Sequence, residues 1–324
     1  MERRLQIVKT IAGPLKRGLF LLLVSRAYRK SDQRAHGWIK AIGRRWSESQ
    51  HNGRRPPWIY EWLLDCTLDA QQKFFRRHFS DPLDLGTAPI GFENLRIRCT
   101  SGNSNSSSIY LFGRERGGLH FDAYRRFARP GTCAVDVGAN LGIHALVLAA
   151  CVGDSGKVHA FEPLPSICTR LAENLKLNAV SNVELHREAL GSMRGDVAFD
   201  ANTSDFNIGK GRVTPQGNIT VPIGTLDDRL SSETLPVSMI KIDTEGHELE
   251  VLKGGVNLIE SQRPVLVMEF NPGEYTLRDI RNRVPQGYAF FELVEHSEKG
   301  VKPIGSRLHH RCDLLIAPHQ NLRG

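Results

Sequence analysis

The sequence predicts an α/β protein built on a mostly parallel β-sheet with helices on both faces. Two observations lead to this fold class. From residue 132 onward, short apolar runs alternate with helical segments, which is the pattern of parallel strands joined by crossover helices. These runs are also mostly apolar, as expected for strands that are buried on both faces. With 40% hydrophobic and 24% charged residues, the composition excludes a disordered chain and a polytopic membrane protein.

Each expected element follows from its own local pattern. Helices are predicted where apolar residues recur three or four positions apart or fill a ten-residue run. The predicted strands span residues 133–137, 158–161, 183–185, 237–242 and 264–270. The predicted helices contain residues 143–152, the series Ile167, Leu171 and Leu175, and the series Leu249, Leu252, Val256 and Ile259. Two final apolar runs, 288–294 and 312–317, have no helix between them and predict an antiparallel hairpin at one sheet edge. Upstream, strand-like runs at 95–99 and 109–112 flank a loop of Ser, Asn and Gly and predict a second hairpin.

Positive charge is concentrated at the start of the chain. Residues 1–60 contain 14 Lys and Arg but only 3 Asp and Glu, whereas the remaining 264 residues carry 29 basic and 32 acidic side chains. Leucines at helical spacing and all four tryptophans lie within residues 1–90. We therefore expect residues 1–90 to form a basic helical extension of the main domain, residues 91–324. The alternative is a basic amphipathic surface that contacts an anionic membrane or nucleic acid. No nucleic-acid-binding motif is present, and the oligomeric state is not predicted.

The cysteines and the apolar runs bear on the compartment. Six cysteines are scattered without a CxxC pair or a metal-binding spacing, which favours a reducing environment. The longest apolar run near the start, residues 18–25, is far shorter than the roughly 20 residues that cross a bilayer. We therefore expect a cytoplasmic protein.

A glycine loop follows the first predicted strand, with the sequence DVGANLG at residues 136–142. Ligands of parallel sheets bind beyond the carboxyl ends of the strands. Gly138 and Gly142 suit a tight turn, and the helix that follows offers free N–H groups to an anion. The GxNxG spacing disfavours a dinucleotide pyrophosphate cradle, which uses GxGxxG.

The next two strands end in residues that suit a nucleoside. Glu162 ends the second strand, where a carboxylate can accept hydrogen bonds from both ribose hydroxyls. Ala189 and its small neighbours after the third strand would let an adenine ring lie flat against the backbone. A solvated glutamate before Pro163 is the structural alternative.

The fourth strand is followed by ionisable residues in the sequence KIDTEGHE, residues 241–248. We consider Asp243, Glu245 and His247 as functional candidates, whereas Glu248 and Glu250 are expected to have a structural role. Glu269, at the end of the fifth strand, is a second-tier candidate. A divalent cation held by Asp243, Glu245 and Glu269 is an alternative, but no metal site is predicted.

A long polar loop at residues 200–217 is expected to close over an acceptor substrate. Asp205, Phe206 and Asn207 are its predicted contacts. Disorder of this loop is the competing interpretation.

Residues 132–271 resemble the FkbM family of S-adenosylmethionine-dependent methyltransferases. The resemblance rests on DVGANLG, FEP, the asparagine at 178, EALGS, GTLDD at 224–228 and IKIDTEGHELEVLKGG at 240–255. It implies a class I methyltransferase fold, with a seven-stranded, mostly parallel sheet and a reversed C-terminal hairpin at residues 287–317. It also implies S-adenosylmethionine as cofactor and a hydroxyl of a sugar, glycan or secondary metabolite as acceptor.

The resemblance implies where the cofactor would bind, but it does not identify the residue that acts as general base. Its methionine part would lie among the residues of the glycine loop, its ribose at Glu162 and its adenine at Ala189, with Asp243 near its amino end or the acceptor. The loop residues are Asp136, Gly138, Asn140 and Gly142. An unactivated hydroxyl must lose a proton during transfer. His247 is the first candidate for the base because neutral imidazole accepts a proton near pH 7; Asp243 and Glu245 are alternatives.

Two other functions compete with this interpretation. One is a nicotinamide-dependent oxidoreductase on a related sheet. The other is a non-catalytic protein that uses its basic N-terminal segment to contact a membrane or nucleic acid.

Overall fold

A computed structural model describes most of the chain beyond residue 83. The described residues are 84–100, 105–106, 109–110, 118–201, 211–294, 301–305 and 308–322. The chain separates into two compact units: Met1–Gly91, Arg98–Arg116 and Ser204–Asn207 form the first, and Phe92–Ile97, Gly117–Thr203 and Ile208–Gly324 the second. The predicted helical extension, residues 1–90, lies almost wholly outside the described residues, so it stays a prediction. Strands β1 (Asp84–Pro89) and β2 (Arg96–Thr100) form a two-stranded sheet.

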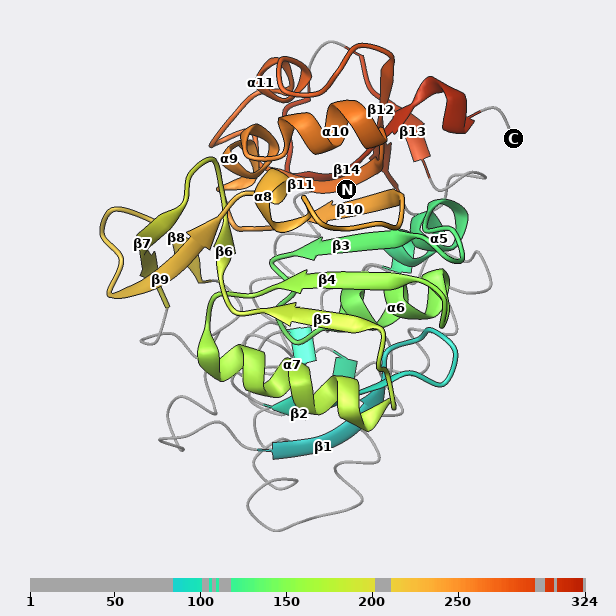
Figure 1. The fold of residues 1–324 in the computed structure, drawn as a ribbon, viewed down its shortest axis with the longest axis vertical. Coiled ribbons are helices and arrows are strands. Elements are labelled where there is room, and N and C mark those ends of the chain that lie inside the picture. Colours follow the sequence, from blue (N-terminus) through green and yellow to red (C-terminus); the bar gives the residue numbers. More distant parts are fainter. Residues whose placement is uncertain are drawn as a thin grey trace, which may run out of the picture. The chain divides into compact units, whose positions relative to one another are not determined.

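The second unit is built on an eight-stranded mixed sheet (Figure 1). Strands β3, β4, β5, β10 and β11 are parallel, and β14 pairs antiparallel with both β11 and β12. This order confirms the predicted class I methyltransferase fold, with β14 inserted between β11 and β12. The short edge strand β13 is an eighth strand that the sequence did not predict. In sheet order the strands are β13 (Val301–Pro303), β12 (Tyr288–Leu293), β14 (Cys312–Pro318), β11 (Val265–Phe270), β10 (Val237–Ile242), β3 (Cys133–Val137), β4 (Lys157–Phe161) and β5 (Val183–His186).

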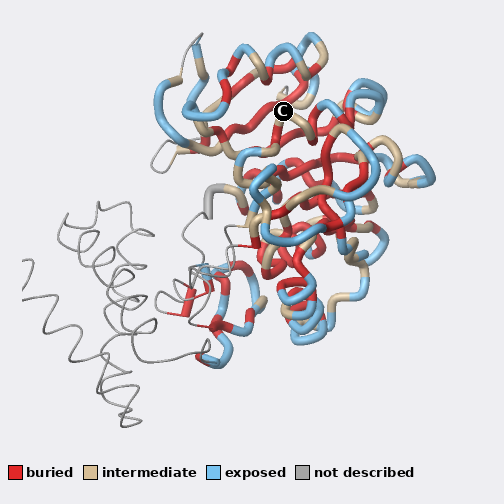
Figure 2. The backbone as a smooth tube through the Cα atoms, turned by 90° about the vertical axis from the view of Figure 1, so that its left-hand side faces the viewer, coloured by how far each residue is buried: buried red, intermediate tan, exposed pale blue. Residues whose placement is uncertain are grey.

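Helices cover both faces of this sheet. On one face α5 and α6 pack against β3, β4 and β10. Apolar residues of α8 to α11 form one core cluster with the side chains of β3, β10 and β11 on the other face, and Figure 2 shows this buried interior in red. The helices are α5 (Gly118–Phe127), α6 (Ile143–Val152), α7 (Pro165–Leu177), α8 (Leu226–Arg229), α9 (Glu248–Lys253), α10 (Val256–Gln262) and α11 (Leu277–Arg281), with a short 3-10 helix η2 (His319–Leu322).

A smaller four-stranded sheet follows β5. It has the order β6-β9-β7-β8, with β6 (Ala189–Leu190), β7 (Gly195–Asp200), β8 (Arg212–Val213) and β9 (Ile219–Gly224). Its apolar residues pack with Leu141, Leu164 and Ile167 in a second core cluster. The predicted acceptor loop, residues 200–217, lies between β7 and β9 and contains the short strand β8. Its predicted contacts Asp205, Phe206 and Asn207 lie outside the described residues.

Two local expectations differ from the structure. The helical stripe at 249–259 is two helices, because α9 ends at Gly254 and α10 begins after Gly255. A side chain at Gly254 would lie 1.8 Å from the carbonyl oxygen of Gly191, so the loop after β6 comes too close for a larger residue. The strand predicted at 109–112 is wrong at Ile109 and Tyr110, which are helical. Both are buried, and a short buried apolar run does not distinguish strand from helix.

The predicted interior is confirmed at its centre. All six residues of β10 are buried, as are all five of β3. Among the described residues, we find no helix with the length and apolar character needed to cross a bilayer.

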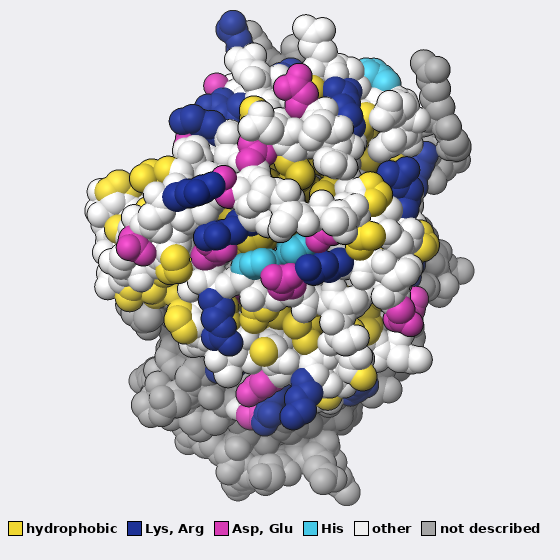
Figure 3. All heavy atoms as spheres, in the orientation of Figure 1, with side chains coloured by type: hydrophobic (Ala, Val, Ile, Leu, Met, Phe, Trp, Pro, Cys, Tyr) yellow, Lys and Arg dark blue, Asp and Glu magenta, His cyan; other side chains and the backbone are white. Residues whose placement is uncertain are grey.

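Polar side chains nevertheless gather at the β4–β5 end of the large sheet. Figure 3 shows histidine side chains between acidic and basic ones on the face over these strands. Val135 pairs with His159, and His159 with Glu184, so this polar group shares a sheet face with Val135.

Candidate functional site

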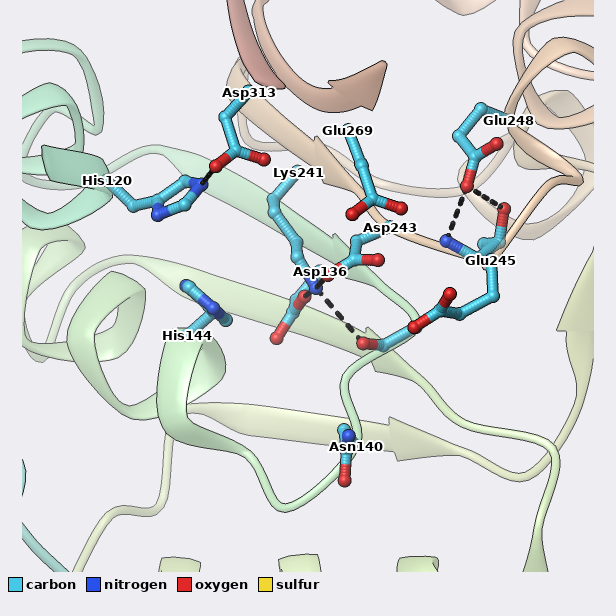
Figure 4. Close-up of polar contacts among 12 residues, drawn as sticks. His120, Asp136, Asn140, His144, Lys241, Asp243, Glu245, Glu248, Glu269 and Asp313 are labelled. Atoms are coloured by element: carbon cyan, nitrogen blue, oxygen red, sulfur yellow. Dashed lines mark hydrogen bonds and ion pairs between the residues drawn. The ribbon is translucent and has the colours of Figure 1, made fainter. Parts of the chain in front are cut away.

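The opposite face of the sheet carries a second polar cluster at the carboxyl ends of the strands. Lys241 is paired with Asp136 on β3 and with Val267 on β11, and Glu269 is paired with Asp313 on β14. Paired residues share a face, and so do residues two apart on one strand. The four charged side chains therefore leave the sheet on one side (Figure 4).

A buried ion pair forms the centre of this cluster. The Nζ atom of Lys241 lies 3.2 Å from Oδ1 of Asp136 and 3.7 Å from Oδ2 of Asp243, and donates a 3.0 Å hydrogen bond to the carbonyl oxygen of Gly138. The side chains of Asp136 and Lys241 are 0% and 5% exposed. Burial raises the pKa of Asp136, against the effect of Lys241. Burial alone would lower the pKa of Lys241, but Asp136 and Asp243 outweigh it and raise the pKa, so the amine stays charged.

The glycine loop lies directly on this pair, and its glycines serve packing. Gly138 has a φ of +77°, and a Cβ there would lie 1.9 Å from the carbonyl oxygen of Asp243. Gly142 has a φ of +83°, and its Cβ would lie 2.9 Å from Leu171 of α7. Glycine is thus required because β3 approaches β10, and because the start of α6 approaches α7. Asn140 also has a positive φ, +48°.

Glu162 is held beside this loop at the end of β4. Its Oε2 accepts a hydrogen bond from the N–H of Asn140 and its Oε1 one from the N–H of Leu164, both at 3.0 Å. Burial raises the pKa of Glu162 to about 7, although both hydrogen bonds favour the charged form. Each oxygen retains a second acceptor position, so the carboxylate that orders the loop can also accept ligand hydroxyls.

Two other predicted residues lie around β6. Ala189 is buried in the second core cluster with Leu141 and Leu164. His247 precedes α9, and its Nε2 would lie 2.7 Å from a Cβ on Gly191, so the ring packs against that glycine. Burial lowers the pKa of His247 despite the nearby carboxylates of Glu250 and Glu248. The imidazole is therefore neutral at pH 7.

An arginine that the sequence reading did not single out links the rim carboxylates. Arg311 donates from Nε and Nη2 to Glu269 at 2.7 and 2.6 Å, and from Nη2 to Glu245 at 3.2 Å. Burial raises the pKa of Glu269 to about 7 even though Arg311 contacts both of its oxygens. Asp243 is more open, with its side chain 42% exposed.

The structure also places an aromatic and histidine group beside the ion pair, which sequence reasoning missed. Nε2 of His120 lies 3.4 Å from Oδ2 of Asp313, and its ring packs edge-on against His144 with centroids 5.2 Å apart. The hydroxyl of Tyr124 is 3.0 Å from Nδ1 of His144. Burial alone would raise the pKa of Asp313, but His120 lowers it. His120 and Tyr124 lie before the glycine loop in the sequence. The argument from residues at the carboxyl ends of strands therefore did not identify them.

Glu248 has the structural role that was expected, but it is buried rather than solvated. Its Oε1 accepts hydrogen bonds from the N–H groups of Thr244 and Gly246, and its Oε2 accepts one from the hydroxyl of Tyr275. Oxygens of Asp243, Glu248 and Glu269 come within 4.8 Å of one another. Arg311 contacts both oxygens of Glu269, so a cation at this group would compete with the arginine.

The structure thus brings the predicted residues together in three groups. Asp136, Gly138 and Asp243 surround Lys241; Asn140 and Glu162 are hydrogen-bonded; Glu245 and Glu269 share Arg311. Gly142, Ala189 and His247 pack separately, against Leu171, the second core cluster and Gly191. The roles assigned to these residues remain predictions.

Comparisons with known proteins identify the domain that carries this cluster. Residues 136–292 match the family model described as Methyltransferase FkbM domain. The hexuronic acid methyltransferase AglP of Haloferax volcanii is 37% identical over 133 residues, which is 41% of this chain and 53% of that protein. The chain thus spans about half the length of this curated relative.

Solved structures resemble the chain more distantly. The methyltransferase FkbM structure from Methylobacillus flagellatus is 17% identical, with 67% of this chain and 53% of that chain covered and a TM-score of 0.40. An S-adenosylmethionine-dependent O-methyltransferase from Thermotoga maritima is 13% identical, with 63% and 64% covered and a TM-score of 0.37. The fold assignment rests on the strand order described above. Residues 136–292, just under half of the chain, thus match the FkbM methyltransferase family model.

Proposed function

We propose that this chain is an S-adenosylmethionine-dependent methyltransferase that methylates a hydroxyl oxygen of a sugar, with a uronic acid or a glycan containing one as the acceptor class. The FkbM domain supports the activity and the cofactor. The hexuronic acid methyltransferase from Haloferax volcanii supports the acceptor class.

One observation carries the cofactor part of the proposal. Glu162 is a buried carboxylate at the end of β4, hydrogen-bonded to Asn140 of the adjacent glycine loop. This is where a doubly wound sheet binds the ribose of a nucleoside. The free acceptor positions on both carboxylate oxygens suit the two hydroxyls of a ribose.

The chain's own residues then have to orient the acceptor and take its proton. When bound, S-adenosylmethionine supplies a methyl group on a sulfonium, which leaves readily. Holding the acceptor oxygen in line with that group provides much of the rate enhancement. Three side chains are candidates to accept the proton of the acceptor hydroxyl. The ring of His247 is neutral, and Asp243 lies beside Gly138. Glu245 is paired with Arg311.

Titration calorimetry with S-adenosylhomocysteine tests the cofactor site. The Glu162→Gln variant should bind at least tenfold more weakly than the wild type, because each charge-assisted hydrogen bond contributes about 1.5–3 kcal/mol. Glu173→Gln, at an exposed position of α7, is the matched control and should bind normally. No binding to the wild type at millimolar ligand would refute the proposal.

Transfer of a labelled methyl group tests the acceptor and the base. Glucuronic acid and a glucuronate-containing oligosaccharide serve as acceptors, with glucose as the uncharged comparison and mass spectrometry locating the methyl group. His247→Gln should reduce kcat more than Asp243→Asn if the imidazole accepts the proton, while S-adenosylhomocysteine affinity stays unchanged for His247→Gln. Methylation at a carboxylate or a nitrogen would contradict O-methylation of a hydroxyl.

A further inference from the structure

A group of metal-binding side chains lies at the β4–β5 edge, across the sheet from the Asp136–Lys241 pair. His159 faces Glu184 in the strand pairing, and Phe161 faces His186. Because the four residues lie at alternate positions of neighbouring strands, they share one sheet face. Figure 3 shows histidine side chains among acidic and basic ones over these strands, and His159 itself is buried. None of these residues takes part in the proposed methyl transfer.

Two imidazole nitrogens and a carboxylate converge here. Nδ1 of His159 lies 2.9 Å from Nε2 of His186. The carboxylate of Glu184 faces both rings, with Oε2 3.9 Å from Nδ1 of His159 and Oε1 3.7 Å from Nε2 of His186. Ligands of a tetrahedral zinc ion, with bonds of about 2.0–2.1 Å, stand roughly 3.3 Å apart. The two nitrogens are already close to this spacing, and one oxygen of Glu184 lies within 4.8 Å of both.

A further carboxylate fixes the tautomer of His159. Oε2 of Glu233 lies 2.8 Å from Nε2 of His159, and Oε1 of Glu233 accepts the N–H groups of Thr234 and Leu235 at 2.8 Å. An ionised carboxylate only accepts hydrogen bonds, so Nε2 of His159 carries a hydrogen and Nδ1 is the nitrogen that faces His186. A carboxylate that orients a histidine through its other nitrogen is the usual support of a metal-bound histidine.

We propose that His159 Nδ1, His186 Nε2 and the Glu184 carboxylate bind one Zn²⁺ ion, with solvent as the remaining ligand. Imidazole nitrogen and carboxylate oxygen are ordinary zinc ligands. The ion takes the place of the hydrogen that otherwise joins the two imidazoles. It also displaces Lys157, whose Nζ contacts Oε2 of Glu184 at 2.6 Å.

The position of this site suggests a structural rather than a catalytic role. The Phe161 ring stacks on the His186 ring with centroids 4.4 Å apart, and the N–H of Glu162 donates to the carbonyl oxygen of His186 at 3.0 Å. An ion joining β4 to β5 therefore secures the strand end from which Glu162 projects. The inference does not depend on the proposed methyltransferase activity.

The test measures zinc bound to the purified full-length chain. The protein is dialysed against Zn²⁺ with a weak chelator, and metal content is determined by mass spectrometry together with Tm. His186→Gln and Glu184→Gln are suitable variants because these side chains are 17% and 49% exposed, so their replacement is compatible with folding. His319→Gln, at an exposed histidine of η2, is the matched control.

We expect both variants to retain one zinc ion fewer per chain than the wild type and the control, or to bind it at least tenfold more weakly. Zinc should raise the Tm of the wild type and of His319→Gln, but not that of the two variants. Equal zinc content in all four proteins would show that any ion binds elsewhere, and an absence of zinc in the wild type would leave only a hydrogen bond between the imidazoles. Either result would overturn the proposal.

Discussion

Replacing Glu162 by glutamine should change how the stability of the protein depends on pH. Burial raises the pKa of this carboxyl from 4.5 to about 7 in the folded chain. Between these two values the folded state holds a proton that the unfolded chain has released. Stability therefore falls as the pH rises from about 4.5 to about 7 and is constant above.

The size of the effect follows from the shift. At about 1.4 kcal/mol for each pKa unit, the wild type should lose about 2.5 kcal/mol of unfolding free energy from Glu162 between pH 5 and pH 8. Glu162→Gln has no such dependence. It should be less stable than the wild type at pH 5, because an amide cannot accept both N–H groups with its single oxygen. At pH 8 the difference in unfolding free energy between the wild type and Glu162→Gln should be about 2.5 kcal/mol smaller than at pH 5, or should change sign.

Urea unfolding at the two pH values measures this difference. Circular dichroism is the appropriate signal because it follows the strands and helices of the described unit, whereas all four tryptophans lie within residues 38–62, outside the described residues. Other titrating groups, including Glu269, contribute equally to the pH dependence of stability in wild type and variant, so their contributions cancel. The control Glu173→Gln should have the stability of the wild type at both pH values. A stability difference between wild type and Glu162→Gln that stays constant from pH 5 to pH 8 would refute the argument that the ionised carboxylate is costly to bury.

Two further predictions concern the packing of the rim. Gly138→Ala should destabilise the chain by more than about 3 kcal/mol, because its Cβ would overlap the carbonyl oxygen of Asp243 at 1.9 Å in a backbone conformation with φ +77°. A Tm equal to that of the wild type would contradict this packing. Lys241→Met should cost about 3–5 kcal/mol by leaving Asp136 buried without its cation, whereas the double variant Asp136→Asn/Lys241→Met should cost clearly less. Chemical denaturation of the wild type, Lys241→Met, Asp136→Asn and the double variant gives the coupling energy, and strictly additive losses would show that the pair is not coupled.

The parallel part of the sheet was predictable from local sequence. The bounds of β3, β10 and α6 agree with their apolar runs to the residue. Both strands are buried on both faces, so the mostly apolar run and the strand coincide even though β3 contains Asp136 and β10 contains Lys241. The division of α9 from α10 was not predictable in the same way. It depends on the contact between Gly254 and Gly191, which lie 63 positions apart.

The candidate site was predictable only where its residues follow strands. Asp136, Glu162 and Asp243 were found because the carboxyl ends of parallel strands meet at one edge. Arg311 and Asp313 enter the rim through the antiparallel pairing of β14 with β11, and His120 enters through the packing of α5. No periodicity or motif spacing in the sequence indicates that these three residues lie close to the rim. Lys241 was quoted as part of a motif, but its burial against Asp136 appears only once the register of β10 and β3 is known.

The charge of the described rim also limits how an acceptor can lie. The rim holds five carboxyl groups and two cations: Asp136, Asp243, Glu245, Glu269 and Asp313, with Lys241 and Arg311. Both cations are already paired with carboxylates, so the rim is negative at pH 7 even when Glu269 is partly protonated. A negative rim favours the positive charge of a sulfonium. It repels the carboxylate of a uronic acid, so such an acceptor would present a hydroxyl to the rim with its carboxylate directed away. Comparing glucuronic acid with glucose, and locating the methyl group on each product, measures this orientation directly.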